Sequence, residues 1–262
     1  MHISLANKVA WITGGSEGIG RGIALLAAQC GAKVAVTGRD IDPLNDVLRE
    51  IEDLGGQAMI AIADVGDSQQ VKQAVANIID RWGQLDFVCA NAGTNGKWAP
   101  IDELTPEDWT STIQVNLTGT YLTIHHAVPY LKRAGGSIVI MSSVNGTRMF
   151  SNEGASAYAT SKAGQLALGQ MLALELAPRK IRVNVICPGA IKSNIHEKTE
   201  REHLRSIETP VEFPEGKIPL THGEMGSPEQ VAQLAVFLAS DWASHITGTP
   251  VWIDGAQSLL QG

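Results

Sequence analysis

The 262-residue sequence predicts an α/β fold in which one parallel β-sheet is covered by helices on both faces. Three observations lead to this prediction. Short, continuously apolar runs recur along the whole chain, as expected of strands that are buried on both faces. Longer segments with helical periodicity separate these runs. No internal repeat, low-complexity stretch or linker divides the chain, so residues 1–262 are expected to form a single domain.

The predicted strands are short and mostly apolar. The first of them ends directly before a glycine-rich loop, and helical segments lie between the others. In chain order, the assigned strands are Lys8–Thr13, Lys33–Thr37, Ala58–Ala63, Leu85–Ala90, Ser137–Met141, Arg182–Cys187 and Pro250–Ile253.

The segments between these strands are predicted to be helices. The shorter ones are Gly20–Cys30, Pro43–Leu54, Ser68–Trp82 and Pro228–Ser240. Two longer stretches, Thr105–Lys132 and Ala155–Ala177, are expected to cover one face of the sheet.

Two longer insertions interrupt this alternation. Residues 94–104 follow the fourth strand, and residues 190–226 lie between the sixth strand and the last long helix. The second insertion is rich in charge and proline, and we interpret it as a substrate lid, with a disordered loop as the alternative. Two pairs of opposite charges, each four residues apart, predict a short exposed helix over 197–202.

A glycine-rich loop follows the first strand and opens the first helix. The sequence Thr13-Gly14-Gly15-Ser16-Glu17-Gly18-Ile19-Gly20 has the spacing Gly-x-x-x-Gly-x-Gly. Glycines let the backbone turn tightly and approach a pyrophosphate, whose charge is met by N–H groups at a helix N-terminus. The spacing differs from the general Gly-x-Gly-x-x-Gly fingerprint. The strand-loop-helix context nevertheless favours a dinucleotide site over a plain glycine-rich turn.

Tyr158 and Lys162 lie four residues apart in a predicted helix, so both side chains project from the same face. A phenol exchanges protons poorly near neutrality because its ordinary pKa is about 10. A neighbouring ammonium favours the phenolate, and the pair is therefore predicted to act as an acid–base catalyst. The alternative is an unrelated tyrosine and lysine on the surface, since this spacing alone is common.

The order of these motifs resembles that of the short-chain dehydrogenase/reductase family, in its smaller branch of roughly 250 residues. The resemblance covers essentially the whole chain. It is carried by the glycine loop, Asn91-Ala92-Gly93, Asn116, Ser143, Tyr158-x-x-x-Lys162 and Pro188-Gly189. It implies a single Rossmann-like, doubly wound domain with a seven-stranded parallel sheet. It also implies a nicotinamide cofactor and hydride transfer to or from a carbonyl or alcohol carbon.

The chain departs from the family pattern in three places. Ala90 stands where the family often has the first residue of Asn-Asn-Ala-Gly, and Ala256 replaces the last glycine of Asp-Gly-Gly. The stretch 145–154, between Ser143 and Tyr158, is about two residues longer than the family pattern. Because this stretch borders the expected active site, the substrate preference of any one relative is not a safe guide to the substrate of this chain.

The resemblance implies catalytic roles for Asn116, Ser143, Tyr158 and Lys162. Tyr158 is expected to be the general acid in carbonyl reduction and the general base in the reverse reaction. Ser143 is expected to stabilise the substrate oxygen, with Ser142 as its rival. Asn116 is expected to bend its helix and hold a water on a proton path from Lys162 to solvent. Purely structural roles for Asn116 and the serines are the alternative.

The resemblance also identifies the residues expected to hold the dinucleotide. They are Gly14, Ser16, Glu17, Gly18, Ile19, Gly20, Arg39, Asp64, Val65, Asn91, Ala92, Gly93, Tyr158, Lys162, Pro188, Gly189 and Ile191. Asp64 and Val65 are expected beside the adenine, and the segment 188–191 beside the nicotinamide. Lys162 is expected to hydrogen-bond the nicotinamide ribose.

The end of the second strand bears on the choice of dinucleotide. NAD-selective Rossmann folds carry an acidic residue there, and this chain carries none. Arg39 can instead pair with a 2′-phosphate, which favours NADP(H). Glu17 opposes this choice, because many NADP-preferring relatives carry a basic residue at that position. NADP(H) is therefore favoured, and NAD(H) remains open.

Composition argues against several other classes of function. The net charge of −7, without a run of Lys or Arg, gives no support to nucleic-acid binding. No signal-peptide pattern is present, and no apolar run approaches the roughly 18 residues that cross a membrane, so we expect a soluble, cytoplasmic protein. The three cysteines are expected to be buried free thiols, and the histidines show no metal-ligand pairing, so no metal is expected.

The leading functional hypothesis is NADPH-dependent reduction of a ketone or 3-oxoacyl carbonyl to a secondary alcohol. The alternative enzyme is an NAD-dependent dehydrogenase of a sugar, polyol or steroid-like alcohol. A non-catalytic dinucleotide-binding protein is a third hypothesis, which the four catalytic residues oppose. The partner is then a small-molecule carbonyl or alcohol substrate. Small residues along Ala155–Ala177, a helix that relatives pair across a two-fold axis, indicate a homotetramer or else a dimer.

Overall fold

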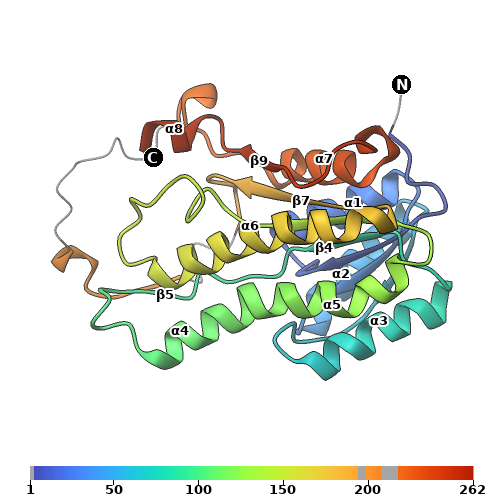
Figure 1. Ribbon diagram of the computed structural model, residues 1–262, viewed down its shortest axis with the longest axis horizontal. Coiled ribbons are helices and arrows are strands. Elements are labelled where there is room, and N and C mark those ends of the chain that lie inside the picture. Colours follow the sequence, from blue (N-terminus) through green and yellow to red (C-terminus); the bar gives the residue numbers. More distant parts are fainter. Residues whose placement is uncertain (1–2, 194–198, 208–217, 262) are drawn as a thin grey trace.

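A seven-stranded parallel sheet with strand order β3-β2-β1-β4-β6-β7-β9 forms the centre of the molecule (Figure 1). The structure is a computed structural model that describes residues 3–193, 199–207 and 218–261. The strands are β1 (Val9–Thr13), β2 (Lys33–Thr37), β3 (Gln57–Ile60), β4 (Phe87–Ala90), β6 (Gly136–Met141), β7 (Ile181–Pro188) and β9 (Pro250–Ile253). The predicted α/β fold and its parallel strands are confirmed.

Helices cover both faces of the sheet, and each face has its own apolar core (Figure 1). Helices α1 (Gly18–Gln29), α2 (Ile41–Asp53) and α7 (Pro228–Ala239) pack on one face. Helices α3 (Ser68–Trp82), α5 (Gly119–Leu131) and α6 (Ser156–Leu176) pack on the other. Two further helices are α4 (Pro106–Ile113) and α8 (Gln257–Gln261). None of the helices in the described ranges is long and apolar enough to cross a membrane.

Successive side chains of a strand point to opposite faces of the sheet, which explains why helices must cover both faces. In β1, Val9 and Trp11 belong to one core and Ala10 and Ile12 to the other. Successive strand residues point to opposite faces, so a continuously apolar strand requires apolar partners on both sides.

The ends of the helices follow local chemistry. The carboxylate of Asp67 accepts hydrogen bonds from the first-turn N–H groups of α3, and this helix ends at Gly83 with φ of 76°. Ser227 and Gln230 form a reciprocal capping box at the start of α7. Capping groups of this kind satisfy N–H groups that lack a partner within the helix.

The strand order reverses between β1 and β4. The chain builds β1, β2 and β3 outward in one direction, then crosses back and builds β4, β6, β7 and β9 in the other. The two crossovers that leave this point diverge to opposite sides, which opens a crevice at the carboxyl ends of the strands.

The two insertions meet in a small second sheet. Strand β5 (Lys97–Trp98) pairs in parallel with β8 (Glu200–Arg201). The helix predicted over 197–202 is therefore wrong for its described part, while residues 197 and 198 lie outside the described residues. The Lys97 ammonium lies 2.7 Å from the Glu202 carboxylate. This hydrogen bond raises the pKa of Lys97. Glu202, which the predicted helix would have paired with Lys198, therefore pairs with Lys97 of the other insertion.

The turn after β9 has a strained backbone. Gly255 and Ala256 both have positive φ angles, of 57° and 70°. The turn is held because the carboxylate of Asp254 accepts hydrogen bonds from the N–H groups of Ala256 at 3.1 Å and Ser258 at 2.9 Å. The left-handed conformation costs roughly 1–2 kcal/mol for a residue with a Cβ atom, so alanine is a costly residue here.

We predict that Ala256→Gly stabilises the protein by up to about 1 kcal/mol, because relief of the left-handed strain exceeds the added freedom of the unfolded chain. Urea unfolding measures this change. The control is Ala235→Gly, since Ala235 is fully buried inside α7 and its replacement must destabilise the helix. A loss of stability in Ala256→Gly as large as that of the control would contradict the prediction.

Candidate active site

A cavity of about 360 Å³ lies at the carboxyl ends of β1 and β4, where the strand order reverses. Open α/β sheets bind ligands at this position. The glycine loop after β1 lines one part of the cavity, and residues following β4, β6 and β7 line the rest.

The glycine loop lies directly against the end of β4. Gly14 has φ of 63°, and a Cβ atom on it would lie 2.8 Å from Cα of Ala92. A Cβ atom on Gly20 would lie 2.0 Å from the carbonyl oxygen of Gly14. The side-chain amide of Asn91 donates to the carbonyl oxygens of Thr13 at 3.0 Å and Gly14 at 3.1 Å. Only glycines permit this close packing, which leaves bare backbone facing the cavity.

The loop leads into the N-terminus of α1. Glu17 is the N-cap residue, and its side chain makes no capping bond to the first turn. The N–H groups of that turn and the positive end of the helix dipole therefore suit an anion. The bare glycine backbone and this helix end together fit the pyrophosphate of a dinucleotide.

Tyr158 and Lys162 project from α6 into the wall of the cavity, as the spacing predicts. The hydroxyl of Ser143 lies close enough to the phenol of Tyr158 to act on its pKa. Lys162 is 4% exposed, and its Nζ donates to the carbonyl oxygen of Met141 at 2.9 Å. The same Nζ lies 5.5 Å from the centre of the Tyr158 ring.

Burial controls the protonation of both groups. It raises the pKa of Tyr158 above the ordinary value, and the hydrogen bond with Ser143 offsets this rise only in part. It lowers the pKa of Lys162 to about 8, while nearby Cys187 acts in the opposite direction. The expected lowering of the Tyr158 pKa is therefore not found, because the sequence indicated the neighbouring lysine and gave no measure of burial. In this environment Tyr158 is held as a proton donor.

The two serines after β6 make different contacts. The hydroxyl of Ser142 donates to the carbonyl oxygen of Lys162 at 2.8 Å, which ties it to the α6 backbone. The hydroxyl of Ser143 accepts the N–H of Asn145 at 3.1 Å and contacts Tyr158. The hydrogen bonds thus favour Ser143 over its rival as the group beside the reacting oxygen.

Asn116 interrupts its helix, as expected. The stretch 105–132 consists of α4, a π-helical turn at Gln114–Thr118 and α5. The side chain of Asn116 accepts the N–H of Thr94 at 2.8 Å and donates to the carbonyl oxygen of the same residue at 2.8 Å. It also donates to the hydroxyl of Ser161 at 3.0 Å. Asn116 therefore joins the loop after β4 to helix α6.

Asn116 does not line the cavity directly and lies behind Gly93. A Cβ atom on Gly93 would lie 3.2 Å from Oδ1 of Asn116 and 3.6 Å from Nζ of Lys162. The missing side chain of Gly93 thus lets both polar groups approach the same stretch of backbone.

The cavity brings together most of the predicted dinucleotide residues. The predicted residues that line it are Gly14, Ser16, Glu17, Gly18, Ile19, Gly20, Arg39, Asn91, Ala92, Gly93, Tyr158, Lys162, Pro188, Gly189 and Ile191. Asp64 and Val65 do not line it. Val65 is buried in the core beneath α3 and α5, and the carboxylate of Asp64 accepts the N–H of Gly66 at 2.8 Å. Their contact with the adenine stays a prediction.

The structure adds lining residues that the sequence did not single out. Some lie in stretches expected to shape the pocket, namely Thr94, Asn95, Asn145, Met149, Asn152 and Ser193. Trp98, which the insertion places near the pocket mouth, lies with its ring centre 6.4 Å from that of Tyr158. Met141, Val144 and Gln257 carried no sequence signal. Gln257 reaches the cavity from α8, where its side chain accepts the N–H of Ala190 at 2.9 Å.

No cysteine or histidine is among the described residues that line this cavity. Cys89 and Cys187 are buried free thiols, and Cys30 is a half-buried one. Within the described residues, no group of three or more His, Cys, Asp or Glu side chains is placed to hold a metal ion.

Comparison with known proteins gives consistent matches along almost the full chain. Residues 14–256 match the model of a family described as Enoyl-(Acyl carrier protein) reductase. The chain is 38% identical over 252 residues to a 3-oxoacyl-(acyl-carrier-protein) reductase FabG of Thermotoga maritima, covering 96% of this chain and 98% of that protein. It is 36% identical over 253 residues to a cyclohexanol dehydrogenase of Acinetobacter sp. (strain SE19), covering 95% and 94%.

Solved structures agree with this result. A 3-ketoacyl-ACP reductase from Sinorhizobium meliloti 1021 superposes with a TM-score of 0.91 at 51% identity, covering 96% of this chain and 99% of that one. Levodione reductase superposes with a TM-score of 0.86 at 29% identity, covering 97% and 98%.

A doubly wound sheet with a glycine cradle and a tyrosine–lysine pair at its switch point defines an oxidoreductase that uses a nicotinamide dinucleotide. The chain belongs to the short-chain dehydrogenase/reductase family. It is an enzyme that acts on CH–OH or C=O groups of a small-molecule substrate.

Proposed function

We propose that this enzyme is an NADPH-dependent carbonyl reductase that converts a ketone or 3-oxoacyl compound to a secondary alcohol. One observation carries the proposal: the side chains of Tyr158 and Ser143 lie next to each other on the wall of the cavity that begins at the glycine loop. The similarity to proteins named 3-oxoacyl- and 3-ketoacyl-ACP reductases supports the substrate class.

A nicotinamide dinucleotide held in the cavity would supply the hydride, and side chains of this chain would move the proton. The substrate oxygen accepts hydrogen bonds from Ser143 and Tyr158, and Tyr158 gives it a proton as negative charge develops. The raised pKa of Tyr158 keeps the proton on the phenol until that moment. Lys162 holds the ribose beside the reacting groups and stabilises the phenolate that remains.

The proton must then be replaced from solvent. Lys162 and the side chain of Asn116 both approach Gly93, which supports a path between them that includes a water held by Asn116. Because the pKa of Lys162 is about 8, this lysine gains and loses a proton within an accessible pH range.

One observation supports the alternative enzyme, which is an NAD-dependent dehydrogenase of a sugar, polyol or steroid-like alcohol. Glu17 lines the same cavity, at the position where a basic residue marks many NADP-preferring relatives. Arg39 favours NADPH, because it lines the cavity, is exposed and has no ion pair with any described residue. A guanidinium in this state can bind a 2′-phosphate without breaking an existing contact.

The proposed unit is a single domain with a lid at about 190–226, of which residues 194–198 and 208–217 lie outside the described residues. The described parts of this segment support the proposal, because Ala190, Ile191 and Ser193 line the cavity. Further along, the hydroxyl of Thr199 accepts a hydrogen bond from Asn95 at 2.7 Å. Protection of the segment from proteolysis by bound dinucleotide would support a lid, and equal cleavage with and without dinucleotide would contradict it.

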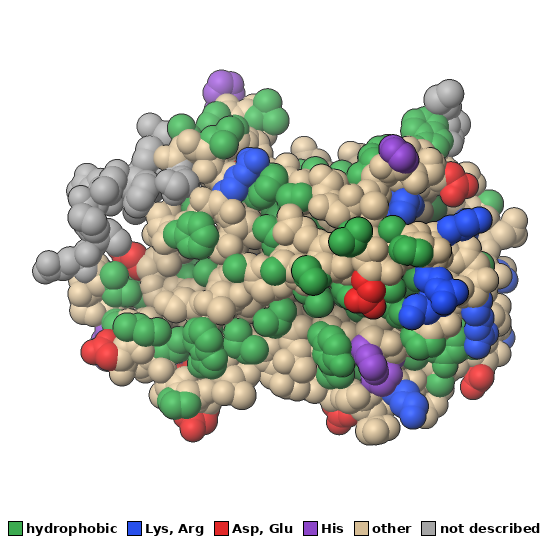
Figure 2. Space-filling view, viewed as in Figure 1, with side chains coloured by type: hydrophobic (Ala, Val, Ile, Leu, Met, Phe, Trp, Pro, Cys, Tyr) green, Lys and Arg blue, Asp and Glu red, His purple; other side chains and the backbone are tan. Residues whose placement is uncertain are grey.

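The proposed assembly is a homotetramer, or else a dimer. Figure 2 shows apolar side chains along the face formed by α4, α5 and α6. On this face Leu174 is 82% exposed and Met171 is 74% exposed, which is unusual for side chains of this size. Leu259 in α8 is also exposed and provides a second apolar surface. Sedimentation at micromolar concentration measures the assembly, and a monomer would contradict it.

We predict that Tyr158→Phe lowers turnover by about 10²–10⁴-fold while dinucleotide binding and thermal stability stay close to those of the wild type. The substitution removes the proton donor and keeps the ring that lies beside Trp98. Turnover is followed by the absorbance of the reduced nicotinamide. Tyr130→Phe, on α5 outside the cavity, is the matched control. Full activity in Tyr158→Phe would remove Tyr158 from the mechanism.

We predict that Arg39→Ala raises the KM for NADPH by about ten- to a hundredfold and leaves the KM for NADH unchanged, because a charge-assisted hydrogen bond to the 2′-phosphate is lost. Initial rates with both dinucleotides measure the two values. Arg49→Ala is the control, since Arg49 pairs with Asp46 on the exposed side of α2. Unchanged binding of NADPH by Arg39→Ala would refute the role of Arg39.

A further inference from the structure

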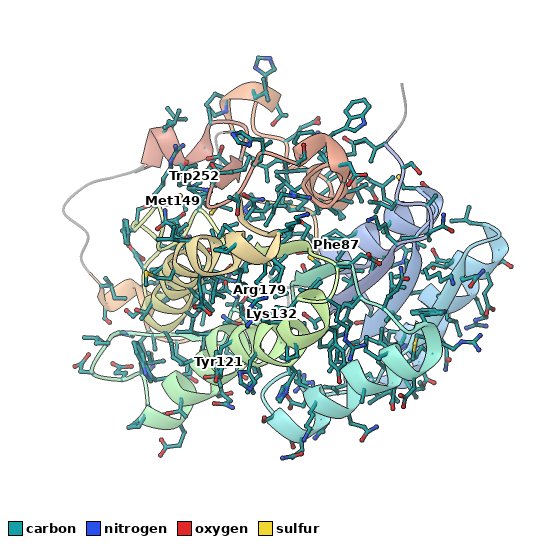
Figure 3. The ribbon with its side chains drawn as sticks, turned by 45° about the vertical axis from the view of Figure 1, so that its right-hand side comes forward. Phe87, Tyr121, Lys132, Met149, Arg179 and Trp252 are labelled. Carbon is teal, nitrogen blue, oxygen red and sulfur yellow. The ribbon has the colours of Figure 1, made fainter. Side chains whose placement is uncertain are left out.

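A buried glutamine of α6 reaches the π-helical turn that carries Asn116. Gln165 is fully buried, and Nε2 of its side chain donates to the backbone carbonyl oxygen of Asn116 at 2.8 Å and to the hydroxyl of Thr120 at 2.7 Å. The hydroxyl of Thr120 donates to the same carbonyl oxygen at 2.7 Å. Figure 3 shows α5 in green beside α6 in yellow, as does Figure 1. These hydrogen bonds therefore connect the two neighbouring helices at the turn.

The partners determine which way round the amide of Gln165 lies. A backbone carbonyl oxygen only accepts hydrogen bonds, so the carbonyl of Asn116 requires the N–H side of the amide. The hydroxyl of Thr120 gives its one proton to that carbonyl, so it also accepts from the amide. Turning the amide over would place its oxygen against two acceptors. Nε2 is thus the atom that faces the turn.

The oxygen of the same amide has no partner. Oε1 of Gln165 is the one buried side-chain N or O atom in the described part of the chain that makes no hydrogen bond. An unpaired buried acceptor costs stability unless an enclosed water binds it, and an apolar side chain of similar size would avoid this cost. Oε1 therefore counts against a purely structural role for Gln165.

The carbonyl that Gln165 holds belongs to a rare backbone conformation. In the turn Gln114–Thr118, the N–H of Gly119 donates to the carbonyl oxygen of Gln114, five residues earlier. Turns of this π-helical kind occur mostly at functional sites. A hydrogen bond from a neighbouring helix to one carbonyl of the turn restricts rotation of the turn. It thereby restricts the direction of the Asn116 side chain.

The side chain of Asn116 connects the turn to the reacting groups. A Cβ atom on Gly93 would lie 3.2 Å from Oδ1 of Asn116 and 3.6 Å from Nζ of Lys162, so both side chains approach the same stretch of backbone. Lys162 and Gln165 are both buried residues of α6, and their separation of three residues places them on one face of this helix. Helix α6 therefore carries Lys162 and also the side chain that holds the backbone of Asn116.

We propose that Gln165 is a positioning residue for the proton path, and that it fixes the π-helical turn so that the Asn116 side chain keeps its place beside Gly93 and Lys162. This inference rests on the proposed reductase function and adds a residue to the proton path proposed there. Gln165 is not among the described residues that line the cavity. Its replacement is therefore expected to slow the supply of protons and to leave the binding of substrate and dinucleotide unchanged.

The test compares the wild type with Gln165→Met, which keeps an unbranched apolar side chain of similar length and removes the amide. The carbonyl of Asn116 keeps the hydroxyl of Thr120 as its partner. Initial rates with ethyl acetoacetate and cyclohexanone are measured with NADPH and NADH, in ordinary and in heavy water. We expect kcat to fall about tenfold, the KM values to change less than about twofold and the solvent isotope effect on kcat to rise.

A second comparison shows whether Gln165 acts through Asn116. Asn116→Ala removes the side chain that the turn positions and keeps the backbone carbonyl. If Gln165 acts through that side chain, Gln165→Met has nothing further to disturb. The double variant is then expected to have the kcat of Asn116→Ala within about twofold. A general structural effect of Gln165 would instead multiply with the effect of Asn116→Ala.

The controls separate positioning from general damage. Gln29→Met makes the same chemical change at an exposed residue at the end of α1, and it should alter neither kcat nor the solvent isotope effect. Thermal unfolding of Gln165→Met is expected to stay close to that of the wild type, because the substitution also removes the unpaired oxygen. If Gln165→Met loses thermal stability, Gln165→Leu takes its place in both comparisons. A large loss of stability in both variants would show a structural residue and overturn the inference.

The outcomes distinguish this inference from the proposed function. A lower kcat at unchanged KM, a larger solvent isotope effect and no further loss in the double variant support the inference. An unchanged kcat in Gln165→Met, a loss that appears in KM, or effects that multiply in the double variant overturn it and leave the reductase function standing. A wild type that reduces neither ketone with either dinucleotide overturns the proposed function and this inference with it.

Discussion

Two reciprocal hydrogen bonds hold helix α6 against the end of strand β6, and the catalytic part of the cavity depends on them. The hydroxyl of Ser142 donates to the backbone carbonyl of Lys162, and the ammonium of Lys162 donates to the backbone carbonyl of Met141. Further along α6, a Cβ atom on Gly169 would lie 2.4 Å from the side chain of Val185 in β7, so the helix lies directly on the sheet. This close contact brings Tyr158, which the helix carries, to Ser143, which follows the strand.

The same contact has an energetic cost that the site uses. An ammonium carries several donors, and Lys162 is almost fully buried with the Met141 carbonyl as its hydrogen-bond partner among the described residues. Burial without a countercharge disfavours the charged form and lowers the pKa to about 8. Burying this ammonium costs stability, and it leaves a lysine on the cavity wall whose proton is released more easily than that of an exposed lysine. Under the proposed function, the dinucleotide and the substrate would supply the acceptors that the protein does not.

The sequence predicted what depends on local pattern and missed what depends on burial and on distant segments. Continuous apolar runs located the strands, and the glycine spacing located the cradle. The spacing of Tyr158 and Lys162 was sufficient to place both side chains on the cavity wall. The direction in which the pKa of Tyr158 shifts depends instead on how deeply the phenol is buried. The charge pairs of 197–202 predicted a helix, because a sequence shows only which charges are neighbours along the chain. In the structure Glu202 forms its ion pair with Lys97, which is far away in sequence. Gln257 reaches the cavity from the last helix, and no local pattern indicates such a contact.

The scaffold and the substrate are determined by different parts of this chain. The structures of a 3-ketoacyl-ACP reductase and of levodione reductase superpose on this chain with TM-scores of 0.91 and 0.86. A sheet shared so closely cannot by itself distinguish their substrates, so discrimination must come from segments that cross the end of the sheet. In this chain those segments supply Trp98 from the insertion after β4 and Asn145 and Asn152 from the stretch 145–154 after β6. Side chains on these segments can change without disturbing the strands that position Ser143, since loops tolerate substitution and insertion better than strands do. Evolution of substrate preference in this fold therefore requires few changes, placed where the backbone has the least influence on stability.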